Sequence, residues 1–205
     1  MIKNPSFNRE NRLLDGPIDL VFGMDEVGRG SFAGPLVASA VCFEKPFKWF
    51  KDINDSKLLT DKKRELLSKL ILKNSIFFIE TINIEIINKS GIGEANKLIF
   101  RKLIKRIKNK YKTQNIYLLI DGRETFNSLN TEFIINGDQK SISIAASSII
   151  AKVYRDRFMR KLHEKYPRYN FFDNKGYGTK YHRDALKKFG LSEIHRKSFK
   201  LDKFL

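Results

Sequence analysis

The sequence of 205 residues has the length of one domain, and its 41% hydrophobic residues are enough for one core. Its 40 Lys and Arg against 23 Asp and Glu leave a net charge of +17, which favours a polyanionic partner such as nucleic acid, although compositional drift towards Lys, Ile and Asn is an alternative source of the charge. The sequence has no long apolar run that could span a membrane and no secretion signal. Cys42 is its single cysteine, which excludes an internal disulfide. We therefore expect a soluble cytoplasmic protein.

The first half of the chain predicts several strands and helices after a polar N-terminal arm over residues 1–18. Three segments have the β-branched, apolar pattern of strands, and the first two form a hairpin: 20–27, 34–43 and 75–84. Two segments have one apolar stripe at helical spacing: 60–73 and 93–111. The face opposite the second stripe is strongly basic.

In the second half, the apolar run 115–122 predicts a central strand that is buried on both faces. The longest helical pattern covers 141–166, and an aromatic, glycine-bearing loop then leads to a short helix at 180–189. This order predicts an α/β protein with a mixed central sheet flanked by helices and a small helical C-terminal extension. We expect a main domain over 19–166, with 167–205 as part of the same compact unit.

Acidic residues lie where these elements end. Asp25 and Glu26 end the first strand, Asp121 ends the most apolar strand, and Asp156 continues the apolar stripe of the long helix. If the two strands are neighbours, the four carboxylates can meet, and two of them 4 Å apart repel by about 4 kcal/mol at an effective dielectric near 20. Oxygen ligands suit Mg²⁺ or Mn²⁺, and a site with two such ions supports phosphodiester cleavage.

Each acid also has a simpler interpretation. Asp121 precedes a glycine and fits a turn, Asp156 fits an ion-paired helix residue, and adjacent strand residues such as Asp25 and Glu26 point to opposite faces. The glycines at 28 and 30 do not form a dinucleotide motif, because Gly34 follows one residue too late. A glycine-flanked Arg29 suits close contact with a phosphate–ribose backbone instead.

Six segments of the chain match motifs of one family in the family's order. They include GMDEVGRGSFAGPLVASAV (23–41), and the others are NDSK (54–57), IDG (120–122), SIAASSIIAKVYRD (143–156), YPRYNFFDNKGYGTKYH (166–182) and HRKSF (195–199). With these motifs, the sequence resembles type 2 ribonuclease H, the ribonuclease HII family, over nearly its whole length. Two departures are Arg168, where the family often has glycine, and the more basic face of the 93–111 helix.

The resemblance implies an RNase H-like fold and metal-dependent cleavage of the RNA strand in RNA–DNA hybrids. It also implies incision 5′ to single ribonucleotides in duplex DNA, with 3′-hydroxyl and 5′-phosphate products. It assigns catalysis and metal binding to Asp25, Glu26, Asp121 and Asp156. It assigns recognition of the 2′-hydroxyl and the adjacent backbone to Gly28, Arg29 and Gly30. It also implies that Tyr177 packs on the deoxyribose after the ribonucleotide and that Lys57 contacts the substrate backbone. The alternatives for these last two are a solvated lysine and an ordinary loop aromatic.

Two rival functions remain at this point. A type 3 ribonuclease H shares the core and the acids, but it normally carries an additional N-terminal domain, for which the 19 residues before the first strand leave no room. A non-catalytic, basic duplex-binding protein would explain the charge and leave the four acids unexplained. No pattern indicates an oligomer, so we expect a monomer.

Overall fold

In the computed structural model, which describes residues 4–205, a five-stranded mixed sheet forms the centre of the molecule. The strands stand in the order β3-β2-β1-β4-β5, with these bounds: Ile76–Ile82, Leu36–Cys42, Leu20–Val27, Ile116–Asp121 and Thr131–Ile134. β2 is antiparallel to β1 and to β3, whereas β1, β4 and β5 run parallel to one another. The predicted α/β class, the mixed sheet and the β1–β2 hairpin are confirmed.

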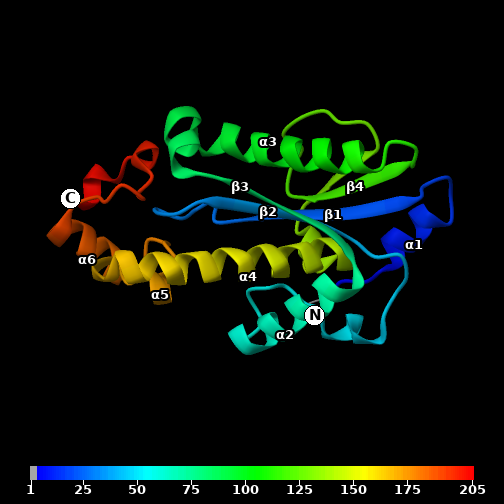
Figure 1. Ribbon diagram of the computed structural model, residues 1–205, viewed down its shortest axis with the longest axis horizontal. Coiled ribbons are helices and arrows are strands. Elements are labelled where there is room, and N and C mark those ends of the chain that lie inside the picture. The colour runs from blue at the N-terminus through cyan, green and yellow to red at the C-terminus, as the bar shows by residue number, and fades with distance from the viewer. Residues whose placement is uncertain (1–3) are drawn as a thin grey trace.

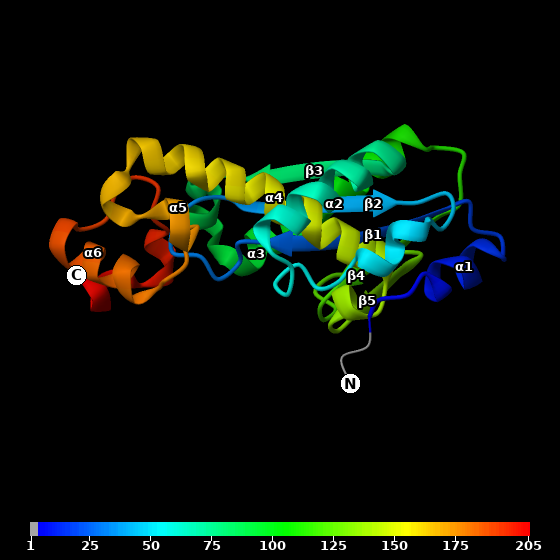
Figure 2. The same ribbon diagram turned by 90° about the horizontal axis from the view of Figure 1, so that it is seen from below.

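Helices cover both faces of this sheet. α3 (Ile84–Lys110) lies on one face and α4 (Ile142–Lys165) on the other, and α2 (Asp61–Asn74) packs on the far side of α4 (Figure 1). The remaining helices are α1 (Asn8–Leu14), α5 (Phe171–Asn174), α6 (Lys180–Phe189) and the 3-10 turns η1 (Lys48–Asp52), η2 (Gly137–Gln139), η3 (Pro167–Tyr169), η4 (Lys197–Phe199) and η5 (Leu201–Phe204). Figure 2 shows α5 and α6 gathered at the C-terminal end of α4. Within residues 4–205, no helix is both long and apolar enough to cross a bilayer.

Side-chain alternation along the strands decides which acid faces which helix. The even-numbered Phe22, Met24 and Ile120 pack in the core under α3, and the odd-numbered Val21 and Leu119 pack with α4. Asp25 and Asp121 therefore lie on the α4 face, and Glu26 lies on the α3 face. The N-terminus of α4 comes very close to β1 at Gly23, where an added Cβ would lie 2.1 Å from the Ser143 carbonyl carbon.

Two elements differ from the prediction. The predicted 93–111 helix begins at Ile84, because the Asn83 side chain accepts a hydrogen bond from the Ile86 N–H and caps an earlier turn. The helical segments join across a break at Gly91, whose φ is 77°. β5 lies in a segment for which the sequence indicated no strand, because a four-residue edge strand with half-buried side chains has no clear periodicity.

Candidate active site

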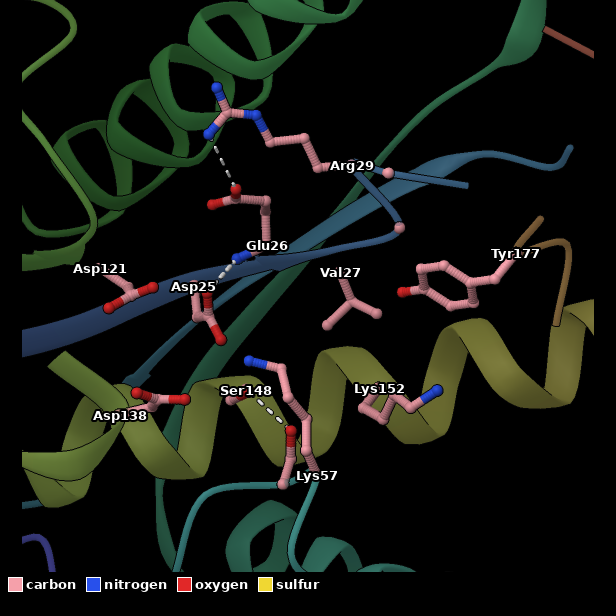
Figure 3. Close-up of a pocket in the computed structure, with 13 residues that line it drawn as sticks. Asp25, Glu26, Val27, Arg29, Lys57, Asp121, Asp138, Ser148, Lys152 and Tyr177 are labelled. Atoms are coloured by element: carbon pink, nitrogen blue, oxygen red, sulfur yellow. Dashed lines mark hydrogen bonds and ion pairs between the residues drawn. The ribbon is translucent and has the colours of Figure 1, made fainter. Parts of the chain in front are cut away.

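A pocket of about 440 Å³ opens where β1 and β4 end, beside α4 (Figure 3). Its lining residues come from β1, the turn after it, β4, η2, α4 and two loops: Asp25, Glu26, Val27, Gly28, Arg29, Gly30, Ser56, Lys57, Asp121, Asp138, Ser148, Lys152 and Tyr177. Eight of the nine residues that the sequence predicted for the site are among them, and Asp156 is not. Asp138, Ser148 and Lys152 were missed.

Strand pairing brings the first acids together. β1 and β4 are parallel neighbours, and the pairing of Met24 with Ile120 puts Asp25 level with Asp121 at their carboxyl ends. Asp138 belongs to η2, which follows β5. The Gly137 N–H donates to Asp121 Oδ1 at 2.6 Å, and this bond holds the η2 backbone against the end of β4. Residues more than 100 positions apart thus share one pocket.

Adjacent Asp25 and Glu26 reach the pocket from opposite faces of β1. The Asp25 carboxylate points to α4 (Figure 3), where the Asp25 N–H donates to Ser147 Oγ at 3.0 Å, and Asp25 Oδ1 accepts from the Glu26 N–H at 2.7 Å. The Glu26 carboxylate points to the α3 side, where Oε1 lies 3.8 Å from Arg29 Nη1 (Figure 3). The alternation of strand residues therefore does not separate the two acids, because β1 ends one residue after them, at Val27.

The carboxylates repel one another. Burial, followed by the charges of Glu26 and Asp121, raises the pKa of Asp25 well above its usual value. Burial raises the pKa of Glu26 to about 7. Burial also raises the pKa of Asp121, and burial together with the charge of Asp121 raises the pKa of Asp138. The pocket therefore concentrates negative charge that a cation would stabilise.

Lys57 is a cationic side chain on the floor of this pocket. Burial by itself lowers its pKa, but Asp55, Asp138, Asp25 and Asp121 together raise the pKa above its ordinary value. The Lys57 N–H donates to Asp55 Oδ1 at 2.9 Å, which fixes the backbone of the loop. Figure 3 shows the Lys57 amine pointing up towards Asp25.

Tyr177 lies across the pocket from Asp121, beyond Val27 (Figure 3). Its N–H donates to the Asn174 carbonyl at 2.8 Å, which fixes the loop that carries it. The guanidinium of Arg155 and the amine of Lys152 lie 5.5 and 5.8 Å from its ring centroid. The aromatic ring therefore lies in a cationic environment at one end of the pocket.

The prediction that Asp156 joins the other acids is not supported by the structure. Its side chain is buried and accepts a 2.8 Å hydrogen bond from Lys152 Nζ, one helical turn earlier. Asp156 lies eight residues after Ser148, so it is about 12 Å further along the helix axis. The residue that joins Asp25, Glu26 and Asp121 in the pocket is Asp138.

The donor set of the pocket fits a hard divalent cation, because all four acidic side chains offer only oxygen. Asp25 is 6% exposed and Asp138 is 6% exposed, and their raised pKa values show that their charges are poorly compensated by the protein. Across residues 4–205, no three Asp, Glu, His or Cys side chains already stand at the spacing of a formed metal site. The pocket therefore suits a divalent cation by the chemistry of its donor atoms and not by the present spacing of its side chains.

Comparison with known proteins shows to which family the chain belongs. The model of the family described as Ribonuclease HII matches residues 22–202. The ribonuclease HII of Acholeplasma laidlawii is 46% identical over 191 residues, which cover 93% of this chain and 92% of the relative. That of Wolbachia pipientis subsp. Culex pipiens is 41% identical over 199 residues, with 97% of both chains covered.

Solved structures agree with these sequence matches. The ribonuclease HII of Archaeoglobus fulgidus, solved in a complex with PCNA, is 25% identical and has a TM-score of 0.74, with 86% of this chain and 93% of that chain covered. The Mn²⁺ complex of Bst-RNase HIII, 18% identical, also has a TM-score of 0.74 and supports the fold, with 98% of this chain and 72% of that chain covered. This protein belongs to the ribonuclease HII family and is an endonuclease of the ribonuclease H type.

Proposed function

We propose that the protein is a metal-dependent endoribonuclease that cleaves the RNA strand of RNA–DNA hybrids and incises 5′ to single ribonucleotides in duplex DNA. The products would carry a 3′-hydroxyl and a 5′-phosphate. The observation that carries this proposal is one pocket that holds four carboxylates beside a Gly-Arg-Gly turn and an aromatic ring. The family assignment excludes a non-catalytic duplex-binding protein and favours type 2 over type 3 ribonuclease H.

In this proposal Asp25, Glu26, Asp121 and Asp138 hold Mg²⁺ or Mn²⁺, two ions during catalysis. When bound, these ions supply Lewis acidity for phosphodiester hydrolysis. The protein's own residues position the substrate around that centre. Lys57 approaches the carboxylates from the floor of the pocket and would attract the phosphate next to the cut.

Substrate selection is assigned to the other end of the pocket. Gly28, Arg29 and Gly30 would contact the ribose and its 2′-hydroxyl, the group that distinguishes RNA from DNA. The ring of Tyr177 would pack on the deoxyribose that follows the ribonucleotide. The net charge of +17 would add affinity for any duplex, and this part of the binding should weaken steeply with salt. We propose that the protein acts as a monomer in the cytoplasm.

The test is product mapping on a DNA duplex that holds one ribonucleotide. Wild-type protein with Mg²⁺ or Mn²⁺ should give a single cut on the 5′ side of the ribonucleotide, and excess chelator should abolish it. Asp25→Asn should remove cleavage while binding to an RNA–DNA hybrid persists. Cleavage that resists the chelator, or a cut on the 3′ side, would contradict the proposed chemistry.

A further inference from the structure

Two arginines beside the pocket are fully buried and have no acidic partner. Arg155 and Arg196 each expose 0% of their surface, and neither forms an ion pair with an Asp or Glu in the part of the chain that the structure describes. Burial, with the charge of Arg155 nearby, lowers the pKa of Arg196 to about 9. A buried guanidinium without a carboxylate is costly, so its hydrogen bonds require an explanation.

Both guanidiniums donate to backbone carbonyls instead. Arg155 donates from Nε to Pro35, from Nη2 to Ala33 and from Nη1 to Lys175, at 2.9, 3.0 and 2.8 Å. Arg196 donates from Nε to the Gly34 carbonyl at 2.9 Å and from Nη1 to the Arg29 carbonyl at 3.0 Å. Four of these five carbonyls belong to residues 29–35, and the fifth lies two residues before Tyr177. The arginines therefore join the two segments to which we assign sugar recognition.

The bond from Arg196 also sets the direction of one peptide group. In a planar trans peptide, the carbonyl and the following N–H point in opposite directions. Because Arg196 draws the Arg29 carbonyl into the protein, the Gly30 N–H points away from it, and Gly30 lines the pocket. This N–H donates to no other residue among 4–205. It is a free donor beside the carboxylates.

Arg155 packs against the same turn at Gly28. Gly28 has a φ of +95°, and a Cβ added there would lie 2.2 Å from Arg155 Nε. The turn thus rests directly on the guanidinium. A second link to the Tyr177 loop comes from the Phe32 N–H, which donates to the Gly176 carbonyl at 2.8 Å. The separation between the turn and Tyr177 is therefore fixed from two sides.

We propose that Arg155 and Arg196 are positioning residues for ribonucleotide recognition, which hold the Gly28–Arg29–Gly30 turn at a fixed place relative to Tyr177 and aim the Gly30 N–H at the ribose 2′-hydroxyl. The inference rests on the proposed function. A deoxyribose offers no acceptor at that position, so the aimed N–H would stay unpaired and the DNA sugar would be disfavoured. Only a planar guanidinium can hold two carbonyls in one plane, and a lysine cannot replace it.

The first experiment compares Arg196→Lys with a control of similar stability cost. Leu67→Ala removes a buried side chain from the core between α2 and α4, away from the pocket. Both are made with and without Asp25→Asn, which prevents cleavage during binding measurements. The measured quantity is the ratio of dissociation constants for an all-DNA duplex and for the same duplex with one ribonucleotide.

Arg196→Lys should reduce this ratio at least tenfold and bring it close to one, while the affinity for the all-DNA duplex changes less than twofold. The kcat/KM for incision, measured without Asp25→Asn, should fall in parallel. Leu67→Ala should lower the melting temperature and leave the ratio unchanged. A wild-type ratio in Arg196→Lys, or an equal loss in Leu67→Ala, would overturn the positioning role.

A second measurement uses the wild-type fold and is independent of the arginine variants. Labelling with ¹⁵N-glycine gives 12 glycine amides, and Gly30→Ala, whose Cβ would meet no atom within 4 Å, identifies the Gly30 signal. That signal should shift with the ribonucleotide duplex and stay in place with the all-DNA duplex. Equal shifts would refute the inference alone, whereas wild-type protein that fails to incise at the ribonucleotide would refute the proposed function itself.

Discussion

Asp138→Asn and Asp156→Asn should differ in their effects on cleavage and on stability, although both remove one buried carboxylate. Asp138 shares the pocket with Asp25, Glu26 and Asp121, whereas Asp156 pairs with Lys152 outside it. A unit charge 4 Å from another contributes about 4 kcal/mol at an effective dielectric near 20. Loss of the Asp138 charge from the donor set should therefore lower kcat about 10²–10³-fold.

The two substitutions should also differ in stability. Burial and the charge of Asp121 raise the pKa of Asp138, which means that its ionised form is disfavoured in the folded state. A neutral Asn at 138 should therefore raise the free energy of unfolding at pH 7 in the absence of metal. Asp156→Asn removes the negative charge from the acceptor of the Lys152 hydrogen bond, between two mostly buried side chains, and should cost about 1.5–3 kcal/mol.

The assay pairs cleavage rates with chemical denaturation of the same preparations. Asp138→Asn should be nearly inactive and no less stable than wild type, and Asp156→Asn should be less stable while it keeps cleavage within about tenfold. Some loss is expected in the second variant, because Lys152 lines the pocket and loses its partner. An inactive Asp156→Asn beside a fully active Asp138→Asn would refute the choice of the fourth acid.

Three further outcomes follow from the site. Burial raises the pKa of Glu26 from 4.5 to about 7, so between these pH values the folded metal-free protein binds more protons than the unfolded chain. The contribution of Glu26 to the free energy of unfolding should therefore fall by about 3 kcal/mol as the pH rises from 4.5 to 7. Glu26→Gln should remove this contribution to the pH dependence of thermal unfolding, measured with chelator. Tyr177→Ala should lower kcat/KM about tenfold at a single ribonucleotide and leave non-specific duplex affinity within twofold; equal losses in both assays would contradict its role. Gly28→Ala should lower incision about 10²-fold, because its Cβ would overlap Arg155 and displace the turn, whereas Gly30→Ala should keep wild-type stability.

Local patterns predicted the sheet and most of the pocket. The residues that end a strand can be read from the sequence, because an apolar run stops where the acids begin, as at Asp25 and Asp121. The turn residues follow within the same segment, so their place in the pocket follows from that of Asp25. To place these residues in one pocket, the only further information required is that β1 and β4 are neighbours.

Asp138 could not be found in this way. Helical spacing on α4 correctly indicated that Asp156 is buried, but burial has two solutions, an ion pair and a shared site, and spacing does not distinguish them. Asp138 lies in a short turn after β5, a strand with no clear periodicity, and it reaches the pocket because the Gly137 N–H binds Asp121. That contact joins two segments through a backbone donor, which every residue except proline carries, so no residue type in the sequence marks it. The paired substitutions at 138 and 156 therefore test the tertiary contact itself, since the family motifs that the sequence contains led to the other acid.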